Sequence, residues 1–162
     1  MEKWVSPTPT LHHSITPILP FSMSLAKKHL AFIRSARIAH LATADRSGHP
    51  HVVPICFVFD GKCFYSVIDE KPKRVAAGKL KRLRNIRENP NVSLIIDHYD
   101  EDWRNLAYVL VSGNAQILFR GAKHRKAVGL LRKKYPQYRS MAIDRRAMIV
   151  ITPKNLTRWA AT

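Results

Sequence analysis

Residues 51–69 constrain the fold more than any other segment, because they read as a β-hairpin with two apolar faces. The turn residues Asp60-Gly61 lie between two runs rich in β-branched and aromatic residues. A two-residue turn there pairs Phe59 with Lys62. Both predicted faces need a cover, which a closed barrel with helices or a second subunit outside supplies. One face carries Val53, Ile55, Phe57, Phe64 and Ile68, and the other carries Val52, Cys56, Val58, Tyr65 and Val67.

The rest of the chain predicts further antiparallel strands with helices around them. Hairpin connections dominate over regular strand–helix alternation, so we expect a mainly β fold, an antiparallel split β-barrel with peripheral helices. A bulge or bend is expected at Gly113 within its strand. Apolar periodicity predicts helices over 24–36, 75–86 and 122–135, and strands over 38–43, 92–99, 106–118 and 147–152, followed by a tail over 153–162.

The first 22 residues differ from the rest of the sequence. They contain four of the ten prolines and show no periodic apolar pattern. We therefore expect residues 1–22 to form a disordered extension and residues 23–162 to form the barrel domain. Met23 directly precedes the first amphipathic segment, so a start of translation at that residue is an open alternative.

The composition excludes some classes of protein. Apolar residues make up 46% of the chain, but no apolar run reaches the roughly 18 residues that a membrane-spanning helix needs. The two cysteines, Cys56 and Cys63, are not cross-strand partners in the expected register. We therefore expect no disulfide, no association with a membrane, and a location in the reducing cytoplasm.

The formal net charge of +17 is concentrated in two segments. Residues 71–87 hold eight Lys or Arg and no acid, and residues 120–134 hold seven more and no acid. A protein that binds single-stranded nucleic acid interleaves aromatic side chains with such cations, and these two segments contain almost none. The charge therefore predicts phosphate attraction without sequence-specific nucleic-acid recognition.

The cations of residues 71–74 follow a strand and lead into a helix. Lys71, Lys73 and Arg74 can converge there with free helix amides on one anion, which suits a phosphate group. A solvated basic loop is the alternative interpretation. The sequence shows no Ser-His-acid arrangement that would organise a nucleophile and no His cluster with metal-ligand partners, so we expect neither a catalytic side chain nor a metal site.

An ordered series of short motifs resembles the pyridoxamine 5′-phosphate oxidase-like (PPOX class) FMN-binding split-barrel superfamily. The series is most similar to the branch of deazaflavin, coenzyme F(420), dependent oxidoreductases, and the resemblance extends over about residues 24–162. The motifs are RIAHLAT at 37–43, GHPHVVP at 48–54, FYS at 64–66, KPKR at 71–74, LRNI at 83–86, NPNVSL at 89–94 and DHYDEDW at 97–103.

The resemblance implies a homodimeric oxidoreductase that binds FMN or coenzyme F(420) at the subunit interface. It places Val53, Pro54, Ile55 and Ser66 on strands beside the cofactor ring. Lys71, Lys73 and Arg74 match the phosphate-binding stretch, and Arg84 with Asn85 matches a helix that approaches the cofactor. Trp103, Arg104 and Trp159 are candidates for the substrate side, with plain packing as the alternative.

The sequence departs from the enzyme that names the superfamily. That enzyme carries basic residues along the strand equivalent to 51–56, where this chain has only His51, and its pyridoxal-phosphate-binding tail has no counterpart here. Vitamin B6 oxidation is therefore not the expected activity. The cofactor is expected to carry the chemistry. A non-catalytic barrel that binds a cofactor or haem, and a basic protein that associates with nucleic acid, are the alternative functions.

Overall fold

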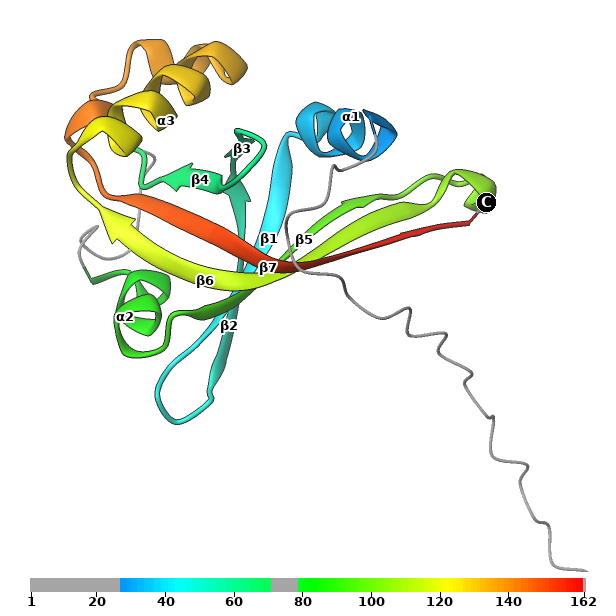
Figure 1. The fold of residues 1–162 in the computed structure, drawn as a ribbon, viewed down its shortest axis with the longest axis horizontal. Helices are drawn as coiled ribbons and strands as arrows, with labels where there is room; N and C mark the ends of the chain where they lie inside the picture. Colours follow the sequence, from blue (N-terminus) through cyan, green and yellow to red (C-terminus); the bar gives the residue numbers. More distant parts are fainter. Residues whose placement is uncertain (1–26, 71–78, 162) are drawn as a thin grey trace, which may run out of the picture.

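A computed structural model describes residues 27–70 and 79–161, which form one curled antiparallel sheet flanked by helices (Figure 1). The sheet has seven strands in the order β2-β1-β5-β6-β7-β4-β3. This arrangement confirms the mainly β, split-barrel prediction. The strands are β1 (Ile38–Ala44), β2 (Pro50–Cys56), β3 (Val58–Phe59), β4 (Phe64–Val67), β5 (Asn91–His98), β6 (Ala107–Leu118) and β7 (Met148–Ala160).

The described residues also form three α-helices, and their sequences explain where they begin and end. These are α1 (Lys27–Ser35), α2 (Lys81–Glu88) and α3 (Ala122–Lys134). Asn89 is the C-cap of α2 and Tyr135 is the C-cap of α3. Each of these residues precedes a proline, which disfavours the helical conformation and so ends the helix. The predicted extension over 1–22 and the first part of the predicted helix over 75–86 lie outside the described residues.

The two faces of the central hairpin pack into two separate cores, as the alternation predicts. Phe57, Phe64 and Ile68 join the first core, in the interior of the barrel, where residues of α1 and α2 also pack. Tyr65 and Val67 join the second core, beneath α3. Helix α3 therefore covers one face of β3, β4 and the start of β7, and the barrel encloses the other.

The predicted register of this hairpin is wrong by two residues. Phe59 lies opposite Phe64, not Lys62. The reason is the side chain of Asp60, whose Oδ1 accepts hydrogen bonds from the backbone N–H groups of Lys62 and Cys63, which moves the tight turn to Gly61-Lys62. Gly61 has φ +96°, a conformation that favours glycine. Because the shift is an even number of residues, every side chain keeps its predicted face.

The last strand is longer than predicted. The sequence pattern ends it at residue 152 because a proline follows, but β7 continues to Ala160 and pairs with β6 along its whole length. The proline is tolerated because it lies at a bulge: Ser112 pairs with Asn155 and Gly113 with Pro153, so Lys154 is the extra residue. The bulge predicted at Gly113 is thus confirmed.

One face of the sheet has no helix against it within the described part of the chain. This outer face of β1, β2, β5, β6 and the second half of β7 exposes several large apolar side chains. It is also hollowed by about 410 Å³, and the side chains of Ala42, Ser93, Ser112 and Asn155 form one row across the hollow. Ile38, Val52 and Leu110 are exposed by 51%, 58% and 38%.

Candidate functional site

The predicted ring-binding residues of β2 divide between two faces. Ile55 is buried in the barrel core, and Val53 packs partly against it. Pro54 is exposed on the outer face, opposite His40 of β1. Strand β2 is the edge of the sheet, and an edge strand offers backbone N–H and C=O groups to a ligand. A planar group can therefore meet Pro54 and the backbone of β2, but not the side chain of Ile55.

Ser66 lies on β4, beside β2, and is buried with only 3% of its surface exposed. It lies two residues after Phe64 and two before Ile68, which both point into the barrel core, so its side chain also faces the barrel interior. Ser66 is therefore close to the strands of the predicted site without reaching the surface.

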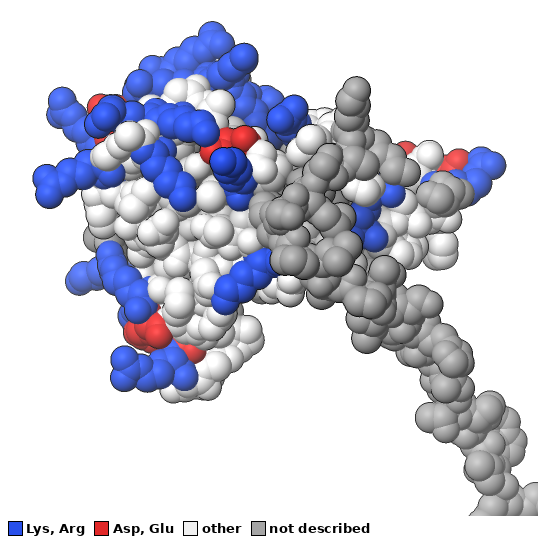
Figure 2. All heavy atoms as spheres, viewed as in Figure 1, with Lys and Arg blue, Asp and Glu red and all other residues white. Residues whose placement is uncertain are grey.

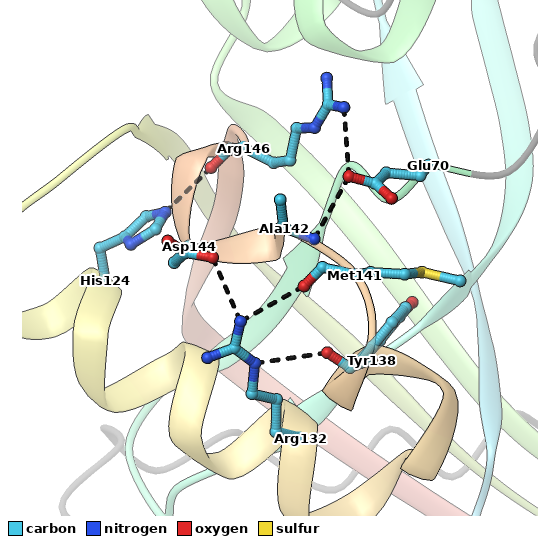
Figure 3. A network of polar contacts seen from close by, with 8 residues as sticks. All are labelled: Glu70, His124, Arg132, Tyr138, Met141, Ala142, Asp144 and Arg146. Atoms are coloured by element: carbon cyan, nitrogen blue, oxygen red, sulfur yellow. Dashed lines mark hydrogen bonds and ion pairs between the residues drawn. The ribbon is translucent and has the colours of Figure 1, made fainter.

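Lys71, Lys73 and Arg74 lie outside the described residues, but the strand end that precedes them is firmly held (Figure 3). Glu70 accepts hydrogen bonds from the backbone N–H of Ala142 at 3.2 Å and from Nη2 of Arg146 at 3.3 Å. Beside it, Oδ2 of Asp69 accepts from the hydroxyl of Tyr138 at 3.1 Å. These contacts tie the residues that follow β4 to the segment between α3 and β7.

A group of basic side chains lies at the start of α2. Lys81 and Arg82 begin the helix, and its N-cap, Leu80, gives no side-chain hydrogen bond to the free amides of the first turn. His51 of β2 is near enough for both cations to act on it. Burial, followed by the charges of Lys81 and Arg82, lowers the pKa of His51. This corner of the barrel therefore carries a local excess of positive charge.

Arg82 is a candidate binding residue that the sequence prediction did not single out. Its Nε atom is buried and has no hydrogen-bond partner among the described residues. Burial lowers the pKa of Arg82, while the nearby carboxylate of Asp69 opposes that shift. A guanidinium N–H without a described hydrogen-bond partner, among other cations, can donate a hydrogen bond to an anion. The sequence signal was its position three residues before Asn85, on the same side of α2.

Arg84 and Asn85, predicted to approach a cofactor, have different environments. Arg84 is exposed and lies 4.0 Å from the carboxylate of Glu88. Asn85 is completely buried, and its Nδ2 donates to Oγ1 of Thr43 at 3.1 Å. Its Oδ1 is buried without a partner among the described residues. Asn85 thus positions α2 against β1, next to the basic corner.

The predicted substrate-side residues lie far from this corner within one chain. Trp103, Arg104 and Trp159 are on the arm formed by β5, β6 and the end of β7, which extends away from α2 (Figure 1). Trp103 is 70% exposed, and Trp159 stacks on Tyr108 with 5.7 Å between ring centroids. Arg104 is held by Asp102 at 2.7 Å. The structure therefore does not bring these three residues to the corner of His51 and Arg82.

Three further features of the described residues concern a metal site, a membrane-spanning helix and a disulfide. No three His, Cys, Asp or Glu side chains in residues 27–70 and 79–161 are grouped so that they could hold a metal ion. Over the same residues, no helix has the length and apolar character needed to span a bilayer. Cys56 and Cys63 form no disulfide.

The sequence profile of the pyridoxamine 5′-phosphate oxidase family matches residues 25–160. No curated protein matches the chain. Among solved structures, a conserved hypothetical protein from Mycobacterium tuberculosis is similar with a TM-score of 0.69 and 19% identity, covering 86% of each chain. The haem storage protein from Vibrio cholerae has a TM-score of 0.65 and 15% identity, covering 85% of this chain and 95% of its own.

A structure described as an F420 reductase is similar as well. Its TM-score is 0.57 with 24% identity, covering 83% of this chain and 98% of its own. These identities support a shared fold. They do not distinguish between haem and F420, the ligands that two of these proteins are named for.

Proposed function

The chain belongs to the pyridoxamine 5′-phosphate oxidase family, and we propose that it is an oxidoreductase that binds FMN or the deazaflavin coenzyme F(420) and acts on a small molecule as a cytoplasmic homodimer. The observation that carries this proposal is the basic corner of His51, Lys81 and Arg82. It contains a buried guanidinium N–H that has no hydrogen-bond partner among the described residues, and the KPKR motif lies shortly before Lys81 in the sequence. A dianionic phosphate fits such a donor set.

In this proposal Lys71, Lys73 and Arg74 bind the cofactor phosphate together with Arg82. The ring lies along the edge strand β2, where Pro54 offers an apolar contact and the backbone offers donors and acceptors. Asn85 and Glu70 act as positioning residues, because each fixes one end of the segment that carries the cations. When bound, the ring supplies the redox chemistry.

The outer face of the sheet supports the homodimer. Ile38, Val52 and Leu110 expose large apolar side chains around a hollow that the described helices leave open. Surface of this kind is usually covered in a working assembly. A second copy on this face would also bring the arm with Trp103, Arg104 and Trp159 to the partner, where we propose that it lines the substrate side.

The phosphate assignment is tested by titrating FMN and coenzyme F(420) into the purified full-length protein and its variants. Charge-assisted contacts contribute about 1.5–3 kcal/mol each, so Lys73→Ala and Arg82→Ala should each weaken binding roughly tenfold or more. Arg125→Ala is the matched control, because Arg125 is an exposed cation on α3. Unchanged affinity in both site variants would refute the assignment.

The homodimer is tested by light scattering at micromolar concentration. We expect a dimer whose interface buries more than about 1,000 Å². Val52→Glu should yield a monomer, because it places a carboxylate in that interface. Ser47→Glu, in an exposed turn, should leave the dimer intact. A monomeric wild-type protein would contradict the proposal.

A further inference from the structure

A cationic hollow, lined by described residues from several parts of the fold, lies at one end of the barrel. It encloses about 170 Å³. Its apolar lining comes from the barrel core, because Ile68 and Leu83 are exposed by only 2% and 1%. The hollow is lined by Ile68, Leu83, Ala147, Phe119 and three arginines, Arg87, Arg145 and Arg146.

Three parts of the fold meet there and hold the lining in place. Arg87 is in the last turn of α2, and Phe119 directly follows β6. The backbone N–H of Ile68 donates to the carbonyl of Ala147 at 2.9 Å, which joins the two sides of the apolar floor. A ring nitrogen of His124 lies 2.9 Å from the carbonyl oxygen of Arg146 and anchors that residue to α3 (Figure 3). The hollow is therefore part of the rigid scaffold.

The charge of the hollow is only partly compensated. Nη2 of Arg146 donates to Glu70 at 3.3 Å. Neither Arg87 nor Arg145 makes an ion pair with an acidic residue in the described part of the chain. Guanidinium groups match the geometry of a phosphate and bind it in a bidentate manner. Two guanidinium groups without a described acidic partner, beside a third, favour a doubly charged head group over a singly charged one.

The lining also requires an apolar part in the ligand. Phe119 is 58% exposed and stands at the hollow without an aromatic partner among the described residues. The volume is below the roughly 300–1,000 Å³ of sites for drug-sized ligands, so the ligand is small. We propose that this hollow binds a small organic phosphate monoester, with its phosphate on Arg87 and Arg145 and its apolar body on Ile68 and Phe119.

This site is separate from the proposed cofactor phosphate site. Lys81 and Arg87 are six residues apart on one helix, which corresponds to about 9 Å along the axis. The described lining of the hollow includes none of the residues of the basic corner, His51, Lys81 and Arg82. The inference therefore goes beyond the proposed function and does not depend on which cofactor the protein binds.

The experiment uses phenyl phosphate as the probe and the methyl NMR signals of Ile68 and Leu83 in the full-length protein as the readout. We expect both signals to shift on titration. Phenyl phosphate should bind at least tenfold more tightly than inorganic phosphate, which lacks the apolar body, and than benzoate, which carries one charge. The reverse order of affinities would overturn the proposal.

Variants locate the ligand within the hollow. The double variant Arg87→Gln/Arg145→Gln should bind phenyl phosphate at least tenfold more weakly than the wild type does. Phe119→Ala should reduce the ratio of the affinity for phenyl phosphate to that for inorganic phosphate. Arg125→Gln should change neither. Lys73→Ala should weaken cofactor binding and leave the shifts caused by phenyl phosphate unchanged. The two proposed sites are therefore tested independently. Ile68 and Leu83 signals that do not move, or that move equally in the double variant, would refute the site.

Discussion

The side-chain amide of Asn85 donates a hydrogen bond to Oγ1 of Thr43 across 3.1 Å, and this bond joins α2 to β1 inside the protein. Oγ1 of Thr43 in turn donates to the carbonyl of His51 at 3.3 Å. The chain of contacts therefore runs from the helix that carries Arg82 to the strand that carries His51. It sets the position of the basic corner from within the core.

Replacing Asn85 with Ala should lower the free energy of unfolding by about 1–3 kcal/mol, because the buried Thr43 hydroxyl loses its donor. Urea denaturation measures this change. Arg84→Ala, at the exposed neighbouring position, should change the free energy by no more than about 0.5 kcal/mol. Equal effects of the two substitutions would show that the Asn85 contact does not hold α2 in place.

Gly113→Ala should destabilise the protein strongly. A Cβ atom at this position would overlap the carbonyl oxygen of Thr152 in the backbone of β7, and overpacking of this kind costs about 1–3 kcal/mol or more. Gly129→Ala on α3 is the control, because its Cβ would meet no atom within 4 Å. That control should stabilise the helix by up to about 1 kcal/mol. The two melting temperatures should therefore move in opposite directions.

The sequence predicted the parts of the fold that depend on local alternation. The faces of Phe64 and Tyr65 were correct, since strand side chains alternate whatever the exact register is. The register was wrong because the Asp60 side chain competes for the turn amides. The end of β7 was wrong because a strand can pass through Pro153 when a bulge accommodates it.

The candidate site was harder to predict from the sequence than the fold was. Arg84 and Asn85 are neighbours in the chain, but only Asn85 is buried, because it lies on the side of α2 that faces β1. Arg82 belongs to a long basic run in which every cation looks alike. Its Nε is buried without a hydrogen-bond partner in the described part of the chain, and this environment depends on how α2 packs against β1 and β6. Such distinctions arise from packing and leave little trace in composition.

Asp60 should make the stability of the protein sensitive to acid. Its side chain is 5% exposed and accepts hydrogen bonds from Lys126, Cys63, Lys62 and Tyr65, and despite burial these donors lower its pKa below the ordinary value of 3.8. The unfolded chain therefore binds a proton at higher pH than the folded protein does. The stabilisation by the ionised Asp60 carboxylate is complete above about pH 4, and it is lost as the pH falls below that value.

The expected result is a shallower decline of unfolding free energy between about pH 4 and pH 2 in Asp60→Asn than in the wild type. The variant should also be less stable at pH 7. Glu101→Gln, at an exposed carboxylate, should leave the slope unchanged. A wild-type slope in Asp60→Asn would contradict the assigned role of this carboxylate.

The net charge of +17 should produce weak binding to polyanions without sequence selectivity. Lys and Arg side chains cluster over α3 (Figure 2), and such a face attracts duplex DNA through released counterions. Affinity measured by fluorescence anisotropy should fall by orders of magnitude between about 50 and 200 mM salt. Cofactor binding should weaken far less, because partly buried ion pairs are screened less. A salt-resistant, sequence-selective complex would favour the nucleic-acid function instead.

The central claim is that this chain binds a phosphorylated tricyclic redox cofactor. Mass spectrometry of the ligand released from the natively purified protein tests it most directly, paired with thermal unfolding in the presence of FMN, coenzyme F(420) or haem. The account predicts that FMN or the deazaflavin is recovered and that the same compound raises the melting temperature. Recovery of haem, together with stabilisation by haem and by neither tricyclic cofactor, would contradict it.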